Sequence, residues 1–173
     1  ELNLRQLSTI PIFACLGSVH DLKLVKSLLT EKKIHTVYHA AAYKHVPLVE
    51  KNPFEGFRNN TIGTHKLLEQ CIDTEVSSFV MISTDKAVRP TNIMGASKRI
   101  AEIIVQVSAR KFPECKLGIV RFGNVLDSRG SVVPLFREQI NKRMPITVTH
   151  PEMTRYFMSI GEAARLVIQA GAM

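Results

Sequence analysis

Residues 79–122 read FVMISTDKAVRPTNIMGASKRIAEIIVQVSARKFPECKLGIVRF. The apolar run Phe79–Ser83 predicts a buried strand, and Leu117–Phe122 predicts another. Between them, Gly95–Lys111 has the length and composition of a helix that stops before Pro113. A strand, a helix and a second strand in this order form a crossover unit, in which the two strands lie parallel in one sheet.

The alternation of strands and helices extends on both sides of this unit. Upstream we expect a buried strand, a helix, a strand and a mostly helical segment, at Ile10–Leu16, Asp21–Lys32, Thr36–Ala42 and Pro53–Asp73. Downstream we expect a loop with Asn124, Asp127, Ser128 and Gly130, a short helix after Pro134, a strand-like Ile146–Thr149 and a helix from Ser159, which has Glu162 at capping-box spacing. The sequence therefore predicts an α/β fold with a doubly wound parallel sheet that is covered on both faces.

The composition excludes several classes of function. The chain has 173 residues, of which 45% are hydrophobic and 22% charged, as is typical of a single globular domain. The net charge is +8, but the positive residues are scattered and form no run of like charges. Because Trp is absent and aromatic residues make up only 6%, we expect no platform for stacking bases and no binding of nucleic acid.

The three cysteines, Cys15, Cys71 and Cys115, stand apart in apolar or helical segments. We expect them to be buried reduced thiols, which suits a cytosolic compartment. Neither they nor the six histidines have metal-ligand spacing, so no metal is expected. No apolar stretch is long enough to span a bilayer, and Glu1–Ser8 lacks the pattern of a signal peptide. We therefore expect a cytoplasmic location for this segment.

Polar residues follow three of the predicted strands. These loops read AAAYKH at residues 40–45, STDK at residues 83–86 and RFGN at residues 121–124. In an open α/β sheet the carboxyl ends of the strands share one edge, where ligands gather. We therefore expect the three loops to converge on one site.

The loop at residues 83–86 places hydroxyl, carboxylate and amine side chains next to one another. Such a group can protonate a leaving hydroxyl and remove a carbon-bound proton, provided that burial tunes the pKa values. An alternative of similar weight is a polar loop whose Asp and Lys are solvated or paired with each other.

Met94 and Lys98 lie four residues apart and therefore share one face of the predicted helix. Short-chain dehydrogenases/reductases have a Tyr and a Lys at this spacing, and Met94 stands where that Tyr would be, although a thioether is neither an acid nor a base. However, STDKAVRPTN at residues 83–92 followed by MGASK at residues 94–98 resembles one extended branch of that family. The branch comprises the UDP-N-acetylglucosamine 4,6-dehydratases of bacterial polysaccharide biosynthesis, in which Met at this place is normal.

Further stretches resemble the same branch. They are AYKHVP at residues 42–47, RFGNVL at 121–126, GSVVP at 130–134 and TVTHPEMTRYF at 147–157. The resemblance covers nearly the whole chain and implies an NAD-binding Rossmann-like fold. The chain therefore resembles this branch as a whole and not only in a single motif.

The resemblance implies dehydration of UDP-N-acetylglucosamine to a 4-keto-6-deoxy sugar nucleotide, with NAD rather than NADP as the cofactor. Carried over by position, Asp85 protonates the departing 6-hydroxyl and Lys86 is the base at C5. Thr84 hydrogen-bonds the 4-hydroxyl, and Lys98 holds the nicotinamide ribose beside Met94. Which group removes the 4-hydroxyl proton stays open, and a relay from Thr84 through water or Asp85 is one hypothesis.

The resemblance also implies residues that bind the cofactor and the substrate. Those on the cofactor side are Ala40, Ala41, Ala42, Asn60, Ser83 and Lys98. Those on the substrate side are Lys44, His45, Asn124 and Arg155, of which Arg155 has the planar fork that suits a diphosphate. The alternatives are tight packing at the alanines, ordinary backbone hydrogen bonding by Asn60, and a surface position for Lys44 and His45.

The sequence departs from the family in two places. No GxxGxxG or GxGxxG occurs, although such a turn holds the dinucleotide diphosphate in the family. Ser18 follows Gly17 where the family has Asp, which weakens an adenine contact there. We therefore expect residues 1–123 to be a partial dinucleotide-binding domain without its first strands, and residues 124–173 a partial substrate-binding region that ends in a Rossmann-type helix.

Two other functions stay open at this point. A nucleotide-sugar 4-epimerase or reductase has the same scaffold, although Thr84, Asp85 and Lys86 favour dehydration because an epimerase needs no acid–base pair for C5 and C6. A non-catalytic truncated remnant would explain the missing glycine-rich turn. The expected partners are a UDP-sugar and, in the full-length enzyme, further copies of itself, and the parent protein is either cytoplasmic or anchored to a membrane outside this segment.

Overall fold

A three-stranded parallel sheet forms the centre of the molecule in the computed structural model, which describes residues 10–128, 131–148, 150–152 and 154–173. The strands are β1 (Thr36–His39), β2 (Ser78–Thr84) and β3 (Lys116–Phe122), and they lie in the order β1-β2-β3. Their register aligns Tyr38 with Val80, and Val80 with Gly118. The predicted parallel sheet is confirmed, with β1 shorter than expected because the chain leaves the sheet after His39.

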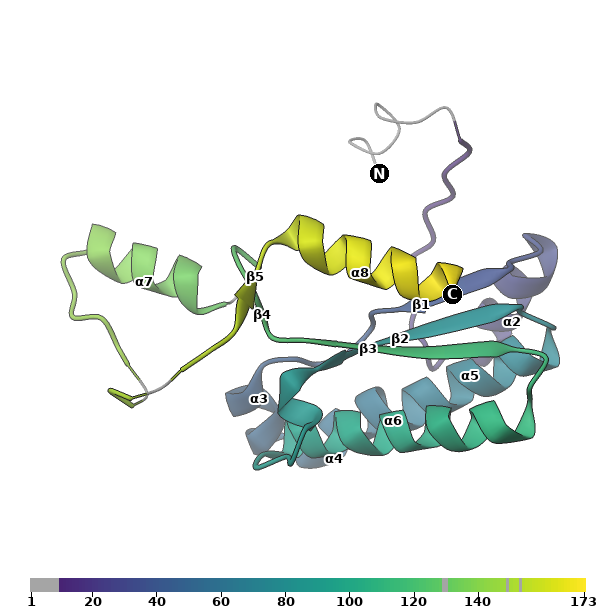
Figure 1. Cartoon of the computed structure of the whole chain (residues 1–173), viewed down its shortest axis with the longest axis horizontal. Coiled ribbons are helices and arrows are strands. Elements are labelled where there is room, and N and C mark those ends of the chain that lie inside the picture. The colour runs from purple at the N-terminus through teal and green to yellow at the C-terminus, as the bar shows by residue number, and fades with distance from the viewer. Residues whose placement is uncertain (1–9, 129–130, 149, 153) are drawn as a thin grey trace.

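Helices cover both faces of this sheet (Figure 1). On one face lie α5 (Gly63–Asp73) and α6 (Ile93–Lys111), and α2 (Leu22–Glu31) packs against α5. On the other face lies α8 (Ile160–Ala172), which contacts all three strands. The doubly wound arrangement is therefore confirmed in the described part of the chain.

Local sequence explains where the helices begin. Asp21 caps α2 by accepting a hydrogen bond from the backbone of Leu24, and Asn92 caps α6 by accepting one from Gly95. Ser159 and Glu162 form the predicted capping box at the start of α8. The remaining elements are α3 (Val46–Lys51), α4 (Pro53–Phe57), a π-helical turn η1 (Arg58–Ile62), a 3-10 turn η2 (Asp85–Ala87), β4 (Asn124–Val125), α7 (Val132–Asn141) and β5 (Phe157–Met158).

The hydrophobic core lies between the sheet and the α5–α6 layer. Phe79 and Met81 of β2 point into it and pack with Leu68 of α5 and Val105 of α6. Each such side chain contributes about 1.5–3 kcal/mol by leaving water. The core also holds Cys71 and Cys115 as free thiols, and their expected burial is confirmed by the structure.

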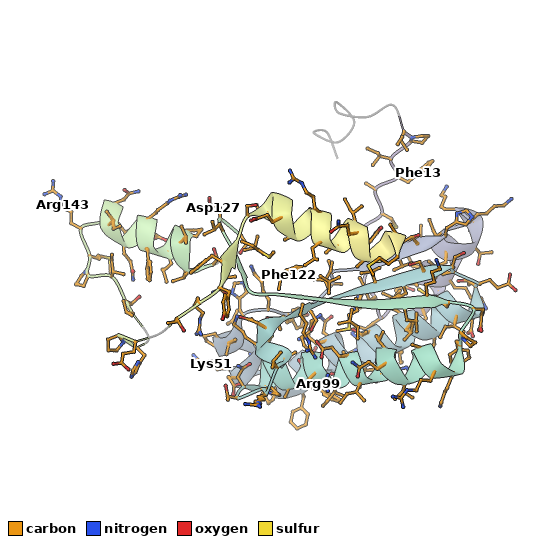
Figure 2. The ribbon with its side chains drawn as sticks, in the orientation of Figure 1. Phe13, Lys51, Arg99, Phe122, Asp127 and Arg143 are labelled. Carbon is orange, nitrogen blue, oxygen red and sulfur yellow. The ribbon has the colours of Figure 1, made fainter. Side chains whose placement is uncertain are left out.

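Two predicted strands are wrong. Residues 11–18 form neither helix nor strand, and Phe13 and Leu16 are exposed; Figure 2 shows Phe13 on a segment that leads away from the sheet. None of the described residues forms a strand beside this segment, and an apolar run cannot become a strand without a hydrogen-bonded neighbour. For the same reason Cys15 is exposed rather than buried.

Residues 146–148 are the second error, because they are irregular rather than strand-like. The backbone N–H of Thr147 donates to the Gln139 side chain at 3.2 Å, and the Gln139 amide donates back to the Thr147 hydroxyl at 2.9 Å. The first of these bonds engages the backbone N–H of Thr147, which a neighbouring strand would otherwise need. Thr149 and the loop residue Gly130 lie outside the described residues.

Residues 124–173 extend the fold beyond the edge of the main sheet. There β4 pairs in parallel with β5, aligning Asn124 with Phe157, while α7 projects away from the sheet in Figure 1. The chain then returns through β5 into α8, which covers the sheet. None of the helices in the described ranges is long and apolar enough to cross a membrane.

A buried histidine predicts a loss of stability in acid. His39 is 2% exposed, and its Nε2 lies 2.8 Å from the Thr64 hydroxyl. Burial, assisted by the charge of Lys98, lowers the pKa of His39 from 6.5 to about 4. Below pH 6.5 His39 therefore binds a proton in the unfolded chain but not in the folded chain. As the pH falls from neutral to 4, the free energy of unfolding should decrease by about 3 kcal/mol.

Urea denaturation across this pH range measures the effect. His39→Gln removes the titrating ring while keeping a hydrogen-bonding group near Thr64, so its stability should depend less on pH. His65→Gln is the matched control, because His65 is an exposed histidine of α5. Equal pH dependence in wild type and His39→Gln would contradict the prediction.

Candidate functional site

A cavity of about 880 Å³ opens at the carboxyl ends of the three strands. The end of β3, marked by Phe122 in Figure 2, forms part of its wall below α8. Most of the sequence-predicted site residues line this cavity; they are Ala40, Ala42, Lys44, His45, Ser83, Thr84, Lys86, Met94, Lys98 and Asn124. The expected convergence of the three polar loops on one edge is therefore observed.

The turn after β2 holds a hydroxyl, a carboxylate and an amine in direct contact. The Thr84 hydroxyl donates to Asp85 Oδ1 at 2.9 Å, and Lys86 Nζ donates to the same oxygen at 3.0 Å. Lys86 Nζ also lies 3.4 Å from Asn124 Oδ1. Thr84 Oγ1 in turn accepts the backbone N–H of Lys86 at 3.3 Å, which fixes the turn. Asp85 itself does not line the cavity, but it contacts two residues that do.

Asp85 is ionised near neutral pH. Burial alone would raise the pKa of its carboxyl group, but hydrogen bonds from Lys86 and Thr84 and the charge of Lys86 bring the pKa below its ordinary value. In the resting site Asp85 can therefore accept a proton before it can donate one.

The first part of α6 lines the same cavity as this turn. Met94 and Lys98 are both buried there, 4% and 5% exposed, on the face that meets the cavity. Burial lowers the pKa of Lys98 to about 8, against the opposing negative charge of Glu102. Gly95 lets the helix approach the turn closely, because a Cβ at this position would overlap the backbone carbonyl oxygen of Lys86.

Asn60 has a different place from the one expected. It is fully buried in η1, its Oδ1 accepts the backbone N–H of Tyr43 at 2.8 Å, and its Nδ2 donates to the Tyr43 carbonyl at 3.0 Å. A further bond at 3.1 Å joins Nδ2 to the Ser97 hydroxyl. Asn60 therefore clasps the loop after β1 to α6 and does not line the cavity, as in the backbone-bonding alternative.

Two other predicted residues lie outside the cavity wall. Ala41 is exposed between Ala40 and Ala42, which do line it. Arg155 is exposed, and its guanidinium donates to the neighbouring carbonyl of Thr154, at 3.5 Å. The structure therefore does not bring Arg155 together with the cavity residues.

Sequence reasoning missed two contributors to the site. One is α8, which lines the cavity with Ile160, Ala163, Ala164, Val167 and Ile168. The other is Glu102, whose carboxylate binds the Ser83 hydroxyl at 2.6 Å. Glu102 follows Lys98 by four residues, so the helical repeat of positions 94, 98 and 102 could have indicated it.

The cavity has features that fit a dinucleotide cofactor. Ala40 and Ala42 present small side chains to it, and Lys98 brings a buried cation to the same space. Small walls allow a flat ring to approach the backbone, and a cation suits hydroxyl and phosphate oxygens. No group of three or more His, Cys, Asp or Glu side chains that could hold a metal ion occurs in the described ranges.

A family model described as polysaccharide biosynthesis protein matches residues 2–173. The capsular polysaccharide biosynthesis protein CapD of Staphylococcus aureus is 55% identical over 164 residues, which cover 95% of this chain and 27% of CapD. A UDP-glucose 4-epimerase of Rickettsia canadensis is 40% identical over 157 residues, which cover 90% of this chain and 46% of that protein. The chain thus spans less than half the length of these curated relatives.

Solved structures share the fold. Pen from Bacillus thuringiensis superposes with a TM-score of 0.92 at 36% identity, over 99% of this chain and 54% of that one. DesIV from Streptomyces venezuelae, a dTDP-glucose 4,6-dehydratase solved with NAD and TYD bound, superposes with a TM-score of 0.84 at 20% identity, over 95% of this chain and 56% of that one. The fold of this chain is therefore that of NAD-binding Rossmann-type proteins.

Proposed function

Because the chain belongs to the polysaccharide biosynthesis protein family of extended short-chain dehydrogenases/reductases, we propose that it forms the catalytic part of a UDP-N-acetylglucosamine 4,6-dehydratase. One observation carries the proposal. Thr84 and Lys86 share a cavity wall with Met94 and Lys98, and Asp85 is hydrogen-bonded to the first two. An acid–base pair in this position is what elimination across C5 and C6 requires, whereas epimerisation at C4 does not require it.

We propose NAD as the cofactor, held by Ala40, Ala42, Ser83 and Lys98 in the cavity. When bound, it supplies the oxidant for C4 and the reductant for C6, so that the net reaction is the loss of one water. The substrate-side residues in this proposal are Lys44, His45 and Asn124. Because Lys98 is buried and cationic below about pH 8, it stabilises negative charge that develops on the C4 oxygen.

The hydrogen bonds of the turn supply a route for the 4-hydroxyl proton without a Tyr. Thr84 Oγ1 takes the proton from the 4-hydroxyl and passes its own proton to the ionised Asp85, along the observed 2.9 Å bond. The protonated Asp85 then donates to the 6-hydroxyl as it leaves as water. One proton is thus removed at C4 and one is delivered at C6, so that Thr84 is again a hydroxyl and Asp85 again ionised at the end.

Lys86 acts at C5 in this scheme. When Asp85 is protonated, the Lys86 ammonium loses its negative partner and gives one proton to solvent water, and it takes a proton back once Asp85 is ionised again. The neutral amine then takes the C5 proton, which the 4-keto group has made acidic, and returns it to C5 after water has left. Asn124, 3.4 Å from Lys86 Nζ, orients the amine.

Mass spectrometry of UDP-N-acetylglucosamine incubated with NAD and the full-length protein tests the proposal. A product lighter by one water is the expected result. A product of unchanged mass that separates as the C4 epimer would support the second candidate, a 4-epimerase, which the Rickettsia relative favours. Recovery of unaltered substrate alone would contradict both enzymatic functions and favour the non-catalytic alternative.

Replacing Thr84 by Val tests the proton relay. Val keeps the shape but has no hydroxyl, so kcat should fall by about 10²-fold. Thr84→Ser is the matched control, because it retains the hydroxyl that bonds Asp85 and caps the turn. Steady-state kinetics measure both variants, and unchanged turnover in Thr84→Val would eliminate the relay.

A further inference from the structure

The Glu102 carboxylate is a buried hub beside the site. Glu102 is 0% exposed, and both of its carboxylate oxygens accept hydrogen bonds. Oε1 accepts from the Ser83 hydroxyl at 2.6 Å and from Arg121 Nε at 2.7 Å. Oε2 accepts from Arg99 Nη1 at 3.0 Å and from Arg121 Nη2. A carboxylate has about four acceptor positions, so this hub is saturated.

These bonds join three of the elements that carry the cavity wall. Ser83 lies near the end of β2, directly before its last residue Thr84, Arg121 lies on β3 three residues before Asn124, and Glu102 itself lies on α6. The two strand ends therefore cannot shift relative to α6 without breaking a charge-assisted hydrogen bond. The burial of Glu102 makes each of these bonds costly to lose.

The charge of Glu102 also acts on Lys98, one helical turn away. Burial alone would raise the pKa of Glu102, but hydrogen bonds from Arg121, Ser83 and Arg99 bring it below its ordinary value, so the group is anionic near neutral pH. Charged and titratable groups near Lys98 include His39 from β1, Asp85 and Lys86 on the turn packed against α6, Lys44 and His45 on the same cavity, and Arg99 and Arg121 around Glu102.

We propose that Glu102 is a positioning residue of this site, which fixes the Thr84–Lys86 and Asn124 turns through Ser83 and Arg121 and keeps Lys98 cationic. This inference deepens the proposed function and rests on it only for its catalytic consequence. Loss of the carboxylate leaves Arg99 and Arg121 without their counter-charge. The lost negative charge of Glu102 and the two uncompensated arginine cations both lower the affinity of Lys98 for its proton.

Nuclear magnetic resonance titration of the lysine Nζ groups in the full chain tests the charge effect. The Lys98 signal is assigned by its loss in Lys98→Arg. Glu102→Gln should lower the titration midpoint of Lys98 by about one pH unit. Glu138→Gln, the same change at an exposed site on α7, should leave it unchanged. An unshifted midpoint in folded Glu102→Gln would overturn the proposal.

Glu102→Asp provides the second test and covers the case in which Glu102→Gln does not fold. Asp keeps the charge but is one methylene shorter, so it withdraws from Ser83. Hydrogen exchange should then quicken at residues 83–86 and 121–124 and stay unchanged in α7. Unaltered exchange at both turns would overturn the positioning role. Neither measurement needs substrate, so a failed dehydration assay would count against the proposed function and not against this inference.

Discussion

Replacing Asp85 by Asn is expected to lower kcat for dehydration by about 10²–10⁴-fold. Asn has nearly the same shape but can neither accept the proton from Thr84 nor deliver it to the 6-hydroxyl. It also leaves Lys86 without the anion that it contacts at 3.0 Å. Steady-state kinetics of product formation measure the loss, and KM should change much less than kcat because Asp85 acts in proton transfer rather than in holding the substrate.

The matched control is Asp127→Asn. Asp127, which is labelled in Figure 2, is an exposed aspartate that forms an ion pair with Arg137. Its backbone has φ 57°, which Asn adopts as readily as Asp. An exposed pair contributes about 0–1 kcal/mol, so stability and turnover should be nearly unchanged. If Asp85→Asn behaved like this control, Asp85 would have no role in proton transfer.

The second large effect is expected for Gly95→Ala. A Cβ on Gly95 would overlap the carbonyl oxygen of Lys86, a backbone atom that cannot rotate away. Either α6 or the catalytic turn must therefore move, at a cost of about 1–3 kcal/mol. This cost exceeds the gain of about 1 kcal/mol that Ala normally brings to a helix interior. We expect both a lower free energy of unfolding and a large loss of kcat, because the turn that carries Lys86 and the helix that carries Lys98 no longer line the cavity in the same arrangement.

Gly161→Ala separates the contact from the helix preference. At Gly161, in the first turn of α8, the nearest heavy atom to a new Cβ is the Ser159 hydroxyl oxygen at 4.0 Å, so the space is open. This variant should be neutral or stabilised by up to about 1 kcal/mol. Urea denaturation measures both variants. Equal effects at the two glycines would show that the close approach of α6 to the turn is unimportant.

The errors of sequence reasoning have a common origin. The apolar run Ile10–Leu16 has the composition of a strand, but a strand exists only beside another strand, and none of the described residues forms one next to residues 11–16. At residues 146–148 the Gln139 side chain bonds the backbone N–H and the hydroxyl of Thr147, and no strand forms there. Composition reports which conformations a segment can adopt, and the neighbours decide which one it adopts.

The sequence by itself determined the parallel sheet and the edge at which its polar loops meet. Local periodicity defines strands and helices, and parallel crossovers place all carboxyl ends together, so the gathering of Thr84–Lys86 with Lys98 was predictable. Only the tertiary structure decided the contacts that hold this edge. The Asn60 clasp on Tyr43 and Ser97, the Glu102 hub and the α8 wall join residues far apart in the chain. The helical repeat places Glu102 on the same face of α6 as Lys98, but its partners, like the other contacts, depend on how whole elements pack, and no local pattern of residues encodes them.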